Sequence, residues 1–505
     1  MRLLRLLACL CLLASVAVAQ DRQVGATAFD NLAAAFPKAE QAGVGEAIFD
    51  NGALRITSRG PSKVVRIDLP IDQIRGTRIL LTGTIKAADV AKPPKPWNGV
   101  KLMIQTESPT GPGYFSPIDL AGTFDWRPAS APAFVPRDAT AARIVLGVED
   151  TTGTAWFKDV SVKITAVMRS RPATRPAFHP DRRINLPHLR GVMYGPNGKA
   201  EDIETLARWG GNLIRWQFYD YEATLPEKRL DLDAYDRWLD RTIAQVDQQL
   251  PLCEKLGIHV VIDLHTPPGF GTRDQWEIFS DPKYQRKFLA VWDKLVRHFK
   301  DQPAVWGYDI VNEPVEGKVA PGLLDWRALA ETTAKQIRAL DPKKAIIIEP
   351  GPFGGWGNLD FWEPIDVPGI VYSVHMYEPL FFTHQGVLDG FPRGPVYPGK
   401  IDGVEWNRDT IRKKLDEVRQ WQLDYNVPIY VGEFSAIRWA NGSADYIRDC
   451  ISVFDEFGWD WSYHAFREWQ GWNVEIEDQS PSDKPTPATQ PTDRLKVLEA
   501  GFHAK

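Results

Sequence analysis

The carboxyl-terminal two-thirds of the chain alternates short apolar runs with longer amphipathic stretches, and this rhythm restricts the fold more than any other feature. Such alternation is typical of parallel βα units. Eight strand-like runs over roughly 320 residues predict an α/β protein whose strands close into a (β/α)₈ TIM barrel. The expected strands are 190–193, 212–216, 259–264, 305–311, 345–348, 370–374, 429–432 and 459–466, and expected helices include 232–256, 284–299, 326–340, 410–423 and one beginning near 493.

Polar side chains follow most of these apolar runs. In a barrel of this kind, the strands' carboxyl ends gather around one pocket, so these side chains are expected to converge. Pro314 cannot extend a strand ladder, so the fourth strand should end where Glu313 emerges. The side chains are Arg215 on the second run, His265 after the third, Asn312 and Glu313 after the fourth, Glu349 after the fifth, His375 and Tyr377 after the sixth and Glu433 after the seventh.

Glu313 and Glu433 both end an apolar run, 120 positions apart. A single Glu-Pro at a strand end more often caps a turn, but two such carboxylates are what glycoside hydrolysis needs. One carboxyl must be protonated to donate to the leaving oxygen, and the other must be ionised to attack the anomeric carbon. The pair therefore predicts a carbohydrate-cleaving site.

Four short motifs in this order resemble glycoside hydrolase family 5: Asp-Leu-His at 263–265, Val-Asn-Glu-Pro at 311–314, His-Met-Tyr at 375–377 and Val-Gly-Glu-Phe at 431–434. The resemblance runs from about residue 189 to the carboxyl terminus. It implies a retaining β-glycosidase that works by double displacement, with Glu313 as acid/base and Glu433 as nucleophile. It implies a polysaccharide or oligosaccharide substrate, such as cellulose or another β-glucan, with mannan cleavage and exo-acting β-glycoside hydrolysis as alternatives.

The same resemblance implies roles for the helper residues. Arg215 would keep the nucleophile ionised, Asn312 would bind the sugar 2-hydroxyl, and Tyr377 would contact the nucleophile. His265 and His375 would line the subsite of the cleaved sugar. A hydrogen-bonded structural role is the alternative for each of them, and Glu349 matches no catalytic motif, which leaves it a site-lining or turn residue.

One departure from the family pattern concerns the eighth strand. Members of the family usually end this strand with a Trp that forms the floor under the bound sugar. Here the segment 461–469 offers His464 near the expected place, with Trp469 reaching in from the following loop as a substrate-binding candidate. The geometry of the subsite, and with it the substrate preference, follows from which residue occupies this position.

Two other classes of function compete with this interpretation. His265, His375, Asp263 and the two glutamates could form the metal site of a barrel hydrolase, but such sites usually show a His-x-His on the first strand, which 190–193 lacks. A carbohydrate-binding protein that kept the barrel without catalysis is disfavoured by the intact glutamate pair. We therefore expect an enzyme without metal or other cofactor.

The amino-terminal part, residues 26–167, alternates with period two and has turns between short strands, which predicts a β-sandwich. Its closing run, 153–162, resembles the last strand of jelly-roll carbohydrate-binding modules. Sugar would then stack on Trp97, Tyr114 or Trp126, whereas Trp156 is expected in the core; a purely supporting domain is the alternative. An Arg/Pro-rich linker, 168–183, separates it from the catalytic domain, 184–505, in which 478–492 is expected to be a flexible excursion.

The first nineteen residues have two arginines, an apolar run and an Ala-Val-Ala ending, the pattern of a secretory signal peptide. We therefore expect a secreted protein, extracellular or periplasmic. The segment that ends at Cys9 resembles a lipoprotein box, but the pattern fits a lipoprotein signal less well than a secretory signal peptide. Cys253 and Cys450 remain and are expected as unpaired buried thiols. A net charge of -5 disfavours nucleic acid or an anionic membrane as partner, and a monomer is expected.

Overall fold

The structure is a computed structural model that describes residues 22–23, 32–109, 111–170, 172, 174, 188–220, 231–272, 275–387 and 390–504. The chain divides into two compact units, Met1–Arg169 and Ser170–Lys505. The predicted signal peptide and most of the predicted linker lie outside the described residues. No helix in the described part of the chain is both long and apolar enough to cross a membrane.

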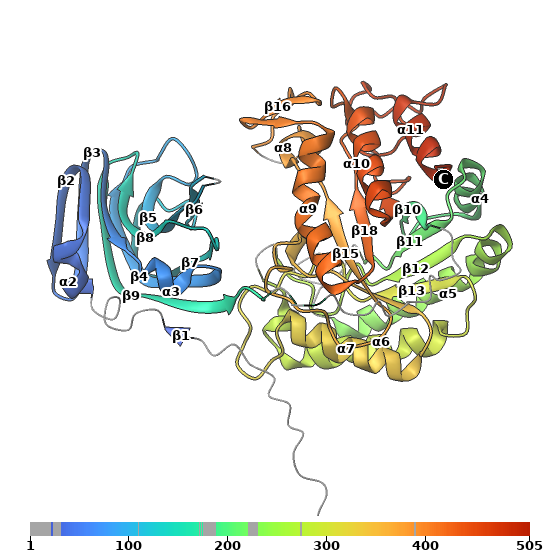
Figure 1. The fold of residues 1–505 in the computed structure, drawn as a ribbon, viewed down its shortest axis with the longest axis horizontal. Helices are drawn as coiled ribbons and strands as arrows, with labels where there is room; N and C mark the ends of the chain where they lie inside the picture. The colour runs from blue at the N-terminus through green and yellow to red at the C-terminus, as the bar shows by residue number, and fades with distance from the viewer. Residues whose placement is uncertain are drawn as a thin grey trace, which may run out of the picture. The chain divides into compact units, whose positions relative to one another are not determined.

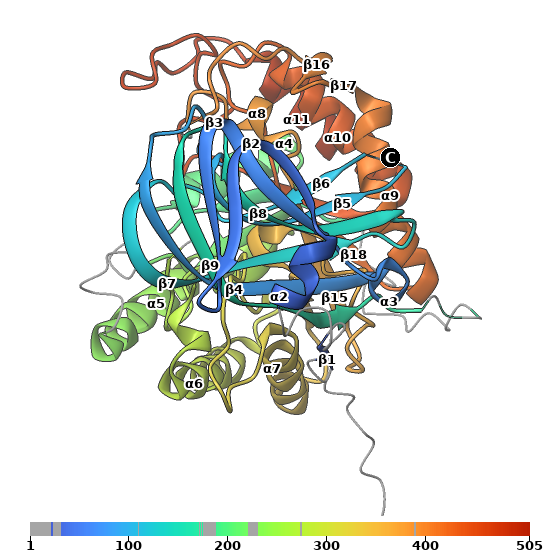
Figure 2. The same ribbon diagram turned by 90° about the vertical axis from the view of Figure 1, so that its left-hand side faces the viewer.

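The amino-terminal unit is built from antiparallel strands (Figures 1 and 2). Its central strand order is β6-β5-β8-β3-β9-β4-β7, with β2 paired to β3 and β1 to β9. Because β5 also packs against β4 and β7, the sheet folds over on itself around a shared core. The elements are β1 (Arg22–Gln23), α2 (Leu32–Ala35), β2 (Glu40–Asp50), β3 (Ala53–Asp68), α3 (Ile71–Ile74), β4 (Thr77–Val90), β5 (Gly99–Glu107), β6 (Gly113–Phe115), β7 (Gly122–Val135), β8 (Ala141–Glu149) and β9 (Gly153–Val167).

Period-two burial forms this core, as the sequence pattern predicts. In β4, Ile79, Leu81, Gly83 and Ile85 are buried while the residues between them are partly exposed. The placement of Trp156 differs from the prediction. Because its neighbours Ala155 and Phe157 fill the core, Trp156 lies on the opposite face, half-buried, with Lys86 Nζ 5.9 Å from the centre of its ring.

The second unit is a closed barrel of eight parallel strands, which confirms the predicted (β/α)₈ fold (Figure 1). All residues of seven strands are buried, and only His259 of the remaining strand is partly exposed, which explains the continuous apolar runs in the sequence. The strands, in order around the barrel, are β10 (Arg190–Tyr194), β11 (Leu213–Gln217), β12 (His259–Asp263), β13 (Val305–Asp309), β14 (Ala345–Ile348), β15 (Ile370–Met376), β18 (Ile429–Phe434) and β19 (Asp460–Tyr463).

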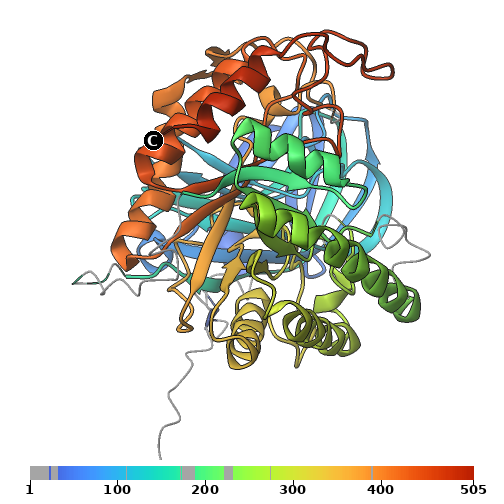
Figure 3. The same cartoon turned by 90° about the vertical axis from the view of Figure 1, so that its right-hand side faces the viewer.

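Amphipathic helices cover the outside of the barrel. Several begin at a side chain that accepts backbone hydrogen bonds from the first turn: Asp231, Asp281, Asp325, Asn407 and Thr492. Figure 3 shows the last two helices, in red, lying side by side. The helices are α4 (Ala200–Trp209), α5 (Leu232–Leu256), α6 (Pro282–Phe299), α7 (Trp326–Leu340), α8 (Leu380–Thr383), α9 (Arg408–Tyr425), α10 (Ser443–Phe457) and α11 (Asp493–Phe502), and a small hairpin pairs β16 (Gly399–Ile401) with β17 (Val404–Trp406). Cys253 and Cys450 are free and buried within α5 and α10, as predicted.

The alternation of side chains along the strands determines what lies inside the barrel. Leu213, Val261 and Ile347 belong to one buried apolar cluster. The side chains two positions further along the same three strands point the same way, because strand side chains alternate with period two. These are Arg215, Asp263 and Glu349, all fully buried. The apolar layer therefore supports a layer of charged groups at the carboxyl ends of the strands.

The segment between β19 and α11 differs from the predicted flexible excursion. Two buried arginines hold it by its backbone carbonyls. Arg438 donates to the carbonyls of 477, 478, 480 and 481, and Arg494 donates to those of 473 and 476 and to the carboxylate of Asp478. The composition predicted mobility because nothing in the local sequence shows that distant arginines satisfy these carbonyls.

We expect Arg494→Ala to lower the free energy of unfolding of the barrel by about 3 kcal/mol, because it leaves several buried carbonyl acceptors without donors. Urea unfolding followed by tryptophan fluorescence measures this. Lys496→Ala on the same helix is the control; Lys496 pairs with Asp493 at the surface, so its loss should cost less than about 1 kcal/mol. Equal effects of the two substitutions would contradict the proposed role of Arg494.

Candidate active site

Arg215, on β11, is the centre of the charged layer inside the barrel. Its guanidinium makes charged contacts with carboxylates from four different strands or strand ends. The contacts are 2.9 Å to Asp309, 3.0 Å to Glu349, 2.8 Å to Glu433 and 3.3 Å to Asp263. Burial disfavours the charged form of Arg215, but these four carboxylates outweigh burial and raise its pKa well above the ordinary value. Arg215 therefore remains a cation.

Glu433, on β18, receives donors on both carboxylate oxygens. Arg215 Nη1 donates to Oε1 at 2.8 Å, and the Tyr377 hydroxyl donates to Oε2 at 2.8 Å. Burial alone would raise the pKa of Glu433, but His375, His464 and Arg215 hold it well below the usual range. The carboxylate is thus ionised and fixed in orientation, as an attacking group requires.

Glu313 follows β13 with its backbone in the left-handed region, at φ 47°. A residue other than glycine in this region typically costs about 1 kcal/mol or more, so other contacts must hold it there. The backbone N–H of Glu313 donates to Glu349 Oε2 at 2.8 Å, and His375 Nδ1 lies 2.9 Å from Glu313 Oε1. Glu349 therefore links the backbone of Glu313 to the guanidinium of Arg215.

His375, on β15, lies between the two glutamates. Its Nδ1 is 2.9 Å from Glu313 and 3.8 Å from Glu433, and its Nε2 is 3.1 Å from Glu349. Burial would lower the pKa of His375, but Glu349 and Glu433 raise it well above the ordinary value. His375 is therefore a second cation among the carboxylates.

These contacts also indicate whether Glu313, His375 and Glu433 are suited to bind a metal ion. Glu313, His375 and Glu433 each have a potential ligand atom, and these atoms lie within 4.8 Å of one another. However, both oxygens of Glu433 already accept from Arg215 and Tyr377, and the raised pKa of His375 disfavours the neutral imidazole that metals need. The donor set suits a pair of carboxylates that works directly on a substrate.

His265 and Asn312 form a second hydrogen-bonded chain beside this centre. His265 Nδ1 lies 2.8 Å from Asp263 Oδ2, and its Nε2 faces the Asn312 side-chain nitrogen at 3.3 Å. Asn312 Oδ1 in turn accepts from Arg215 at 3.0 Å. These side chains lie with Glu313 in a cavity of about 300 Å³ that is also lined by the aromatic residues Tyr219, Phe270, Trp276 and Phe353. Apolar rings around a few converging polar groups are typical of a ligand site.

The end of β19 brings His464 next to Glu433. His464, not Trp469, contacts the buried carboxylate, with Nδ1 3.0 Å from Glu433 Oε2. Trp469 packs edge-on against Trp472 at 4.6 Å between ring centres, and Trp472 stacks on Tyr377 at 5.1 Å. Trp469 is thus connected to Tyr377 through Trp472.

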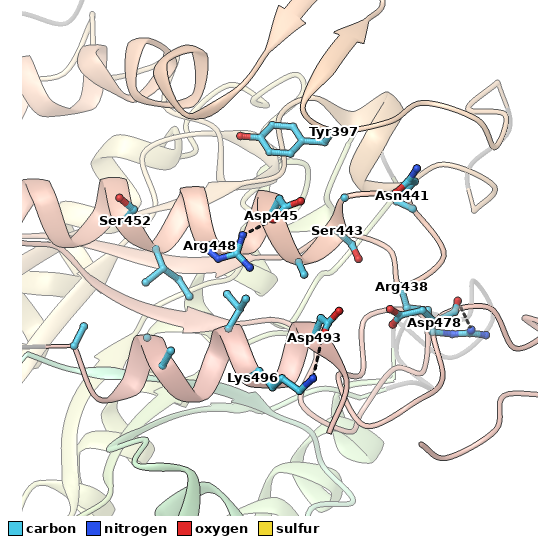
Figure 4. A pocket seen from close by; sticks show the side chains of 18 of the residues that line it. Tyr397, Arg438, Asn441, Ser443, Asp445, Arg448, Ser452, Asp478, Asp493 and Lys496 are labelled. Carbon is cyan, nitrogen blue, oxygen red and sulfur yellow. Dashed lines mark hydrogen bonds and ion pairs between the residues drawn. The ribbon is translucent and has the colours of Figure 1, made fainter. Parts of the chain in front are cut away.

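A larger cavity, of about 870 Å³, lies elsewhere, between α10 and α11 (Figure 4). Two pairs of charged side chains along it lie on a single helix each, Arg448 with Asp445 and Lys496 with Asp493. None of the strand-end groups described above lines it. Although it is larger, this cavity is therefore a weaker candidate for the active site than the cavity beside Glu313.

The structure brings together Arg215, His265, Asn312, Glu313, His375, Tyr377 and Glu433, all singled out from the sequence. Sequence reasoning missed Asp309 and undervalued Glu349. Burial and the neighbouring carboxylates raise the pKa of Asp309 well above its usual range, although Arg215 opposes this. The signal that could have found both is their position at the ends of adjacent buried strands.

The site defines a class of protein: a barrel with two carboxylates at its strand ends, beside an aromatic-lined cavity, is the architecture of a glycoside hydrolase. Residues 178–470 match the family model Cellulase (glycosyl hydrolase family 5). The chain belongs to this family, and it is an endoglucanase-like glycoside hydrolase. The amino-terminal unit lies outside the matched residues.

Similar proteins include Endoglucanase C of Acetivibrio thermocellus, 26% identical over 294 residues that cover 52% of this chain and 83% of the relative. Cellodextrinase A of Ruminococcus flavefaciens is 24% identical over 268 residues, covering 52% of this chain and 72% of the relative. Among solved structures, Cel5A of Thermotoga maritima in complex with mannotriose is 24% identical, with a TM-score of 0.47, and covers 61% of this chain and 97% of that chain.

We expect Arg215→Met to destabilise the barrel by about 3–5 kcal/mol near pH 8, because buried carboxylates lose the cation that they share. The loss should shrink near about pH 5. Arg215 is one of the cations that hold the pKa of Glu433 down, so without it this buried carboxyl takes up a proton at a higher pH, and protonation removes part of the cost as the pH falls. Urea unfolding at both pH values measures this. Arg297→Met, which removes an exposed pair with Asp293, is the control and should have little effect at either pH. If Arg215→Met lowered the free energy of unfolding equally at both pH values, this role of Arg215 would be contradicted.

Proposed function

We propose that the protein hydrolyses β-glycosidic bonds with retention of anomeric configuration, Glu433 acting as nucleophile and Glu313 as acid/base. The observation that carries the proposal is the spacing of the pair: one carboxylate oxygen of each residue lies within 4.8 Å of the other. Retaining enzymes hold their carboxyl groups about 5–5.5 Å apart, whereas inverting enzymes leave about 6.5–9.5 Å for a water molecule. The short spacing favours direct attack by Glu433.

The environments of the two glutamates support different roles. Glu433 is fully buried, ionised and bound on both oxygens, which suits attack on the anomeric carbon. Glu313 is half-buried at the edge of the aromatic-lined cavity, where it can reach a leaving oxygen. In the first step Glu433 forms a bond to the anomeric carbon while Glu313 transfers its proton to the departing alcohol.

The second step reverses these roles. Glu313, now ionised, takes a proton from water as the water attacks the anomeric carbon and the bond to Glu433 breaks. The carboxylate of Glu433 leaves with its negative charge next to Arg215, His375 and His464. Asn312, fixed by Arg215, has an amide nitrogen with which to bind a sugar hydroxyl near the reacting centre.

The proposed substrate is a β-linked glucan, cleaved internally. Supporting this, several relatives are named endoglucanases and one is named a cellodextrinase. A β-xylosidase of Phanerodontia chrysosporium is also similar, at 24% identity over 206 residues, and keeps exo-acting β-glycoside hydrolysis as a second candidate. A panel of β-glucans, mannan, xylan and aryl glycosides would identify the preferred sugar.

We further propose that the protein is secreted, on the basis of its amino-terminal sequence, and that its amino-terminal unit binds carbohydrate. Supporting the second point, Trp97 and Tyr114 are 55% and 62% exposed, so their rings are accessible for stacking on a sugar. Trp126 is half-buried with Lys158 Nζ 4.5 Å from its ring centre, so its ring face is partly covered. A lysine also lies near Trp97, with Lys95 Nζ 5.4 Å from its ring centre, so it is their greater exposure that makes Trp97 and Tyr114 the better stacking candidates.

The carboxylate roles are tested by two substitutions. Glu313→Ala should reduce hydrolysis of β-glucan by about 100- to 10,000-fold but spare aryl glycosides with good leaving groups, which depart without a proton. Glu433→Ala should abolish both, because no glycosyl-enzyme can form. Azide should rescue Glu313→Ala by giving a β-glycosyl azide and, if it rescues Glu433→Ala, should give the α-azide.

Asp240→Ala, an exposed carboxylate on α5, is the control and should leave both activities unchanged. NMR of the first-formed product reports its anomeric configuration. An inverted product would overturn the retaining mechanism even with β-glucan as the substrate.

The binding proposal for the amino-terminal unit is tested in the full chain carrying Glu433→Ala, so that no substrate is consumed. Adding Trp97→Ala should weaken retardation in gels containing soluble glucan and reduce retention on cellulose by about 5-fold or more, the value of roughly 1 kcal/mol of stacking. Val44→Ala, an exposed apolar side chain of the same unit, is the matched control. Unchanged retention with Trp97→Ala and Tyr114→Ala would favour the supporting role.

A further inference from the structure

His464 stands where members of this family usually have an indole, and its contacts are polar. Its Nδ1 lies 2.8 Å from the Tyr377 hydroxyl and 3.0 Å from Glu433 Oε2. The ring also packs edge-on against Trp472, with 4.8 Å between ring centres, which fixes its plane. Tyr377 and His464 thus share the same oxygen of Glu433, opposite the oxygen bound by Arg215.

Glu468, in the segment after β19, faces the other ring nitrogen. Its Oε1 lies 3.5 Å from His464 Nε2, an ion-pair distance, and its Oε2 accepts from the backbone N–H of Arg467 at 3.0 Å. Within the described part of the chain, Oε1 is a buried atom that no hydrogen-bond donor satisfies. A buried carboxylate oxygen costs free energy unless a cation or a proton compensates it, and His464 Nε2 is next to it.

The contacts among Glu433, Tyr377, His464 and Glu468 indicate which atoms carry protons. His464 Nδ1 lies 3.0 Å from Oε2 of Glu433, an ionised carboxylate that can only accept a hydrogen bond. His464 must therefore carry a proton on Nδ1. Its Nε2 and Glu468 Oε1 would repel each other as two lone pairs, so one more proton lies between them. The pair is either an imidazolium beside a carboxylate or a neutral imidazole beside a carboxylic acid.

We propose that His464 and Glu468 are positioning residues for the nucleophile, which hold one proton as a pair and direct it, through the His464 ring, at Glu433 Oε2. This proposal rests on the proposed role of Glu433. Glu468 keeps His464 in the tautomer that donates to Glu433, and the shared proton supplies positive charge beside it. In the second step this charge stabilises Glu433 as it leaves the sugar.

The direction of the electrostatics agrees with the geometry. Burial would lower the pKa of His464, but Glu433 and Glu468 outweigh burial and raise it. Burial raises the pKa of Glu468, so this carboxyl readily shares the proton. The other titratable or charged groups around the pair are Tyr377, His375, Arg215 through Glu433, and His384, whose pKa burial lowers to about 4 and which is therefore neutral at the working pH.

Glu468→Gln tests the proposal, because it keeps the size of the side chain and removes the group that shares the proton. An amide can still donate to a neutral His464, so the fold is preserved while the positive charge is lost. The ionised form of Glu433 is then less favoured, its pKa rises, and activity is lost at a higher pH as the solution is acidified. We expect the acidic limb of kcat/KM for an activated aryl β-glycoside to move up by about one pH unit.

Glu475→Gln is the matched control, since Glu475 lies in the same segment but pairs with Arg467. It should leave the acidic limb in place. A second variant, His464→Phe, keeps a flat ring without a proton and should move the limb in the same direction as Glu468→Gln. Thermal melting confirms that each variant is folded.

A readout that does not depend on turnover is the ¹⁵N NMR titration of His464. In the unaltered protein, Nδ1 should stay protonated across the working pH range, and the imidazolium should lose its proton at a lower pH in Glu468→Gln. An active enzyme whose acidic limb and His464 titration are both unchanged by Glu468→Gln would overturn this inference and leave the proposed function intact. An unaltered protein that cleaves no β-glycoside would instead count against the proposed function.

Discussion

The buried guanidinium of Arg215 is the interaction on which the catalytic end of the barrel depends. Four carboxylates approach it, and an isolated charge of either sign would be very costly at this depth. The arginine makes it possible to bury the carboxylates, and the carboxylates fix the arginine. Because the five groups come from β11, β12, β13, β18 and the end of β14, their pairing also fixes how these strand ends lie relative to one another. The position of Glu433 is thus a property of the whole barrel.

This dependence explains what could be predicted from the sequence. The eight strands are visible because buried parallel strands are continuous apolar runs, and Glu313 and Glu433 are visible because each ends such a run. The contacts of Glu349 with Arg215 and with the backbone of Glu313 were not predictable, since they depend on the register between strands. The same holds for Arg438 and Arg494. The carbonyl partners of Arg438 are 39 or more residues away in the chain, and those of Arg494 are up to 22 residues away.

The eighth strand shows how one substitution changes the chemistry of a site. An indole at the end of β19 could offer a flat surface and one N–H donor, but it could not carry a charge near neutral pH. His464 brings a ring of smaller area that can carry a proton, and the buried Glu468 beyond it makes that proton useful. Beside Glu433, the rings of Tyr377 and Trp472 stack on each other, 5.1 Å apart and nearly parallel.

The charges of the site also differ in how they can respond to the reaction. Arg215 is permanently charged and bound on all sides, so its own charge stays the same throughout the reaction. His375 and His464 can change protonation. In the proposed mechanism Glu433 becomes an ester, so both histidines lose a carboxylate neighbour, and their pKa values should fall toward those set by burial. A proton then becomes easier to release from His375, which contacts Glu313 at 2.9 Å, at the stage when Glu313 has given up its own. The geometry thus links the charge of the proposed nucleophile to the protonation of the proposed acid/base through one shared imidazole.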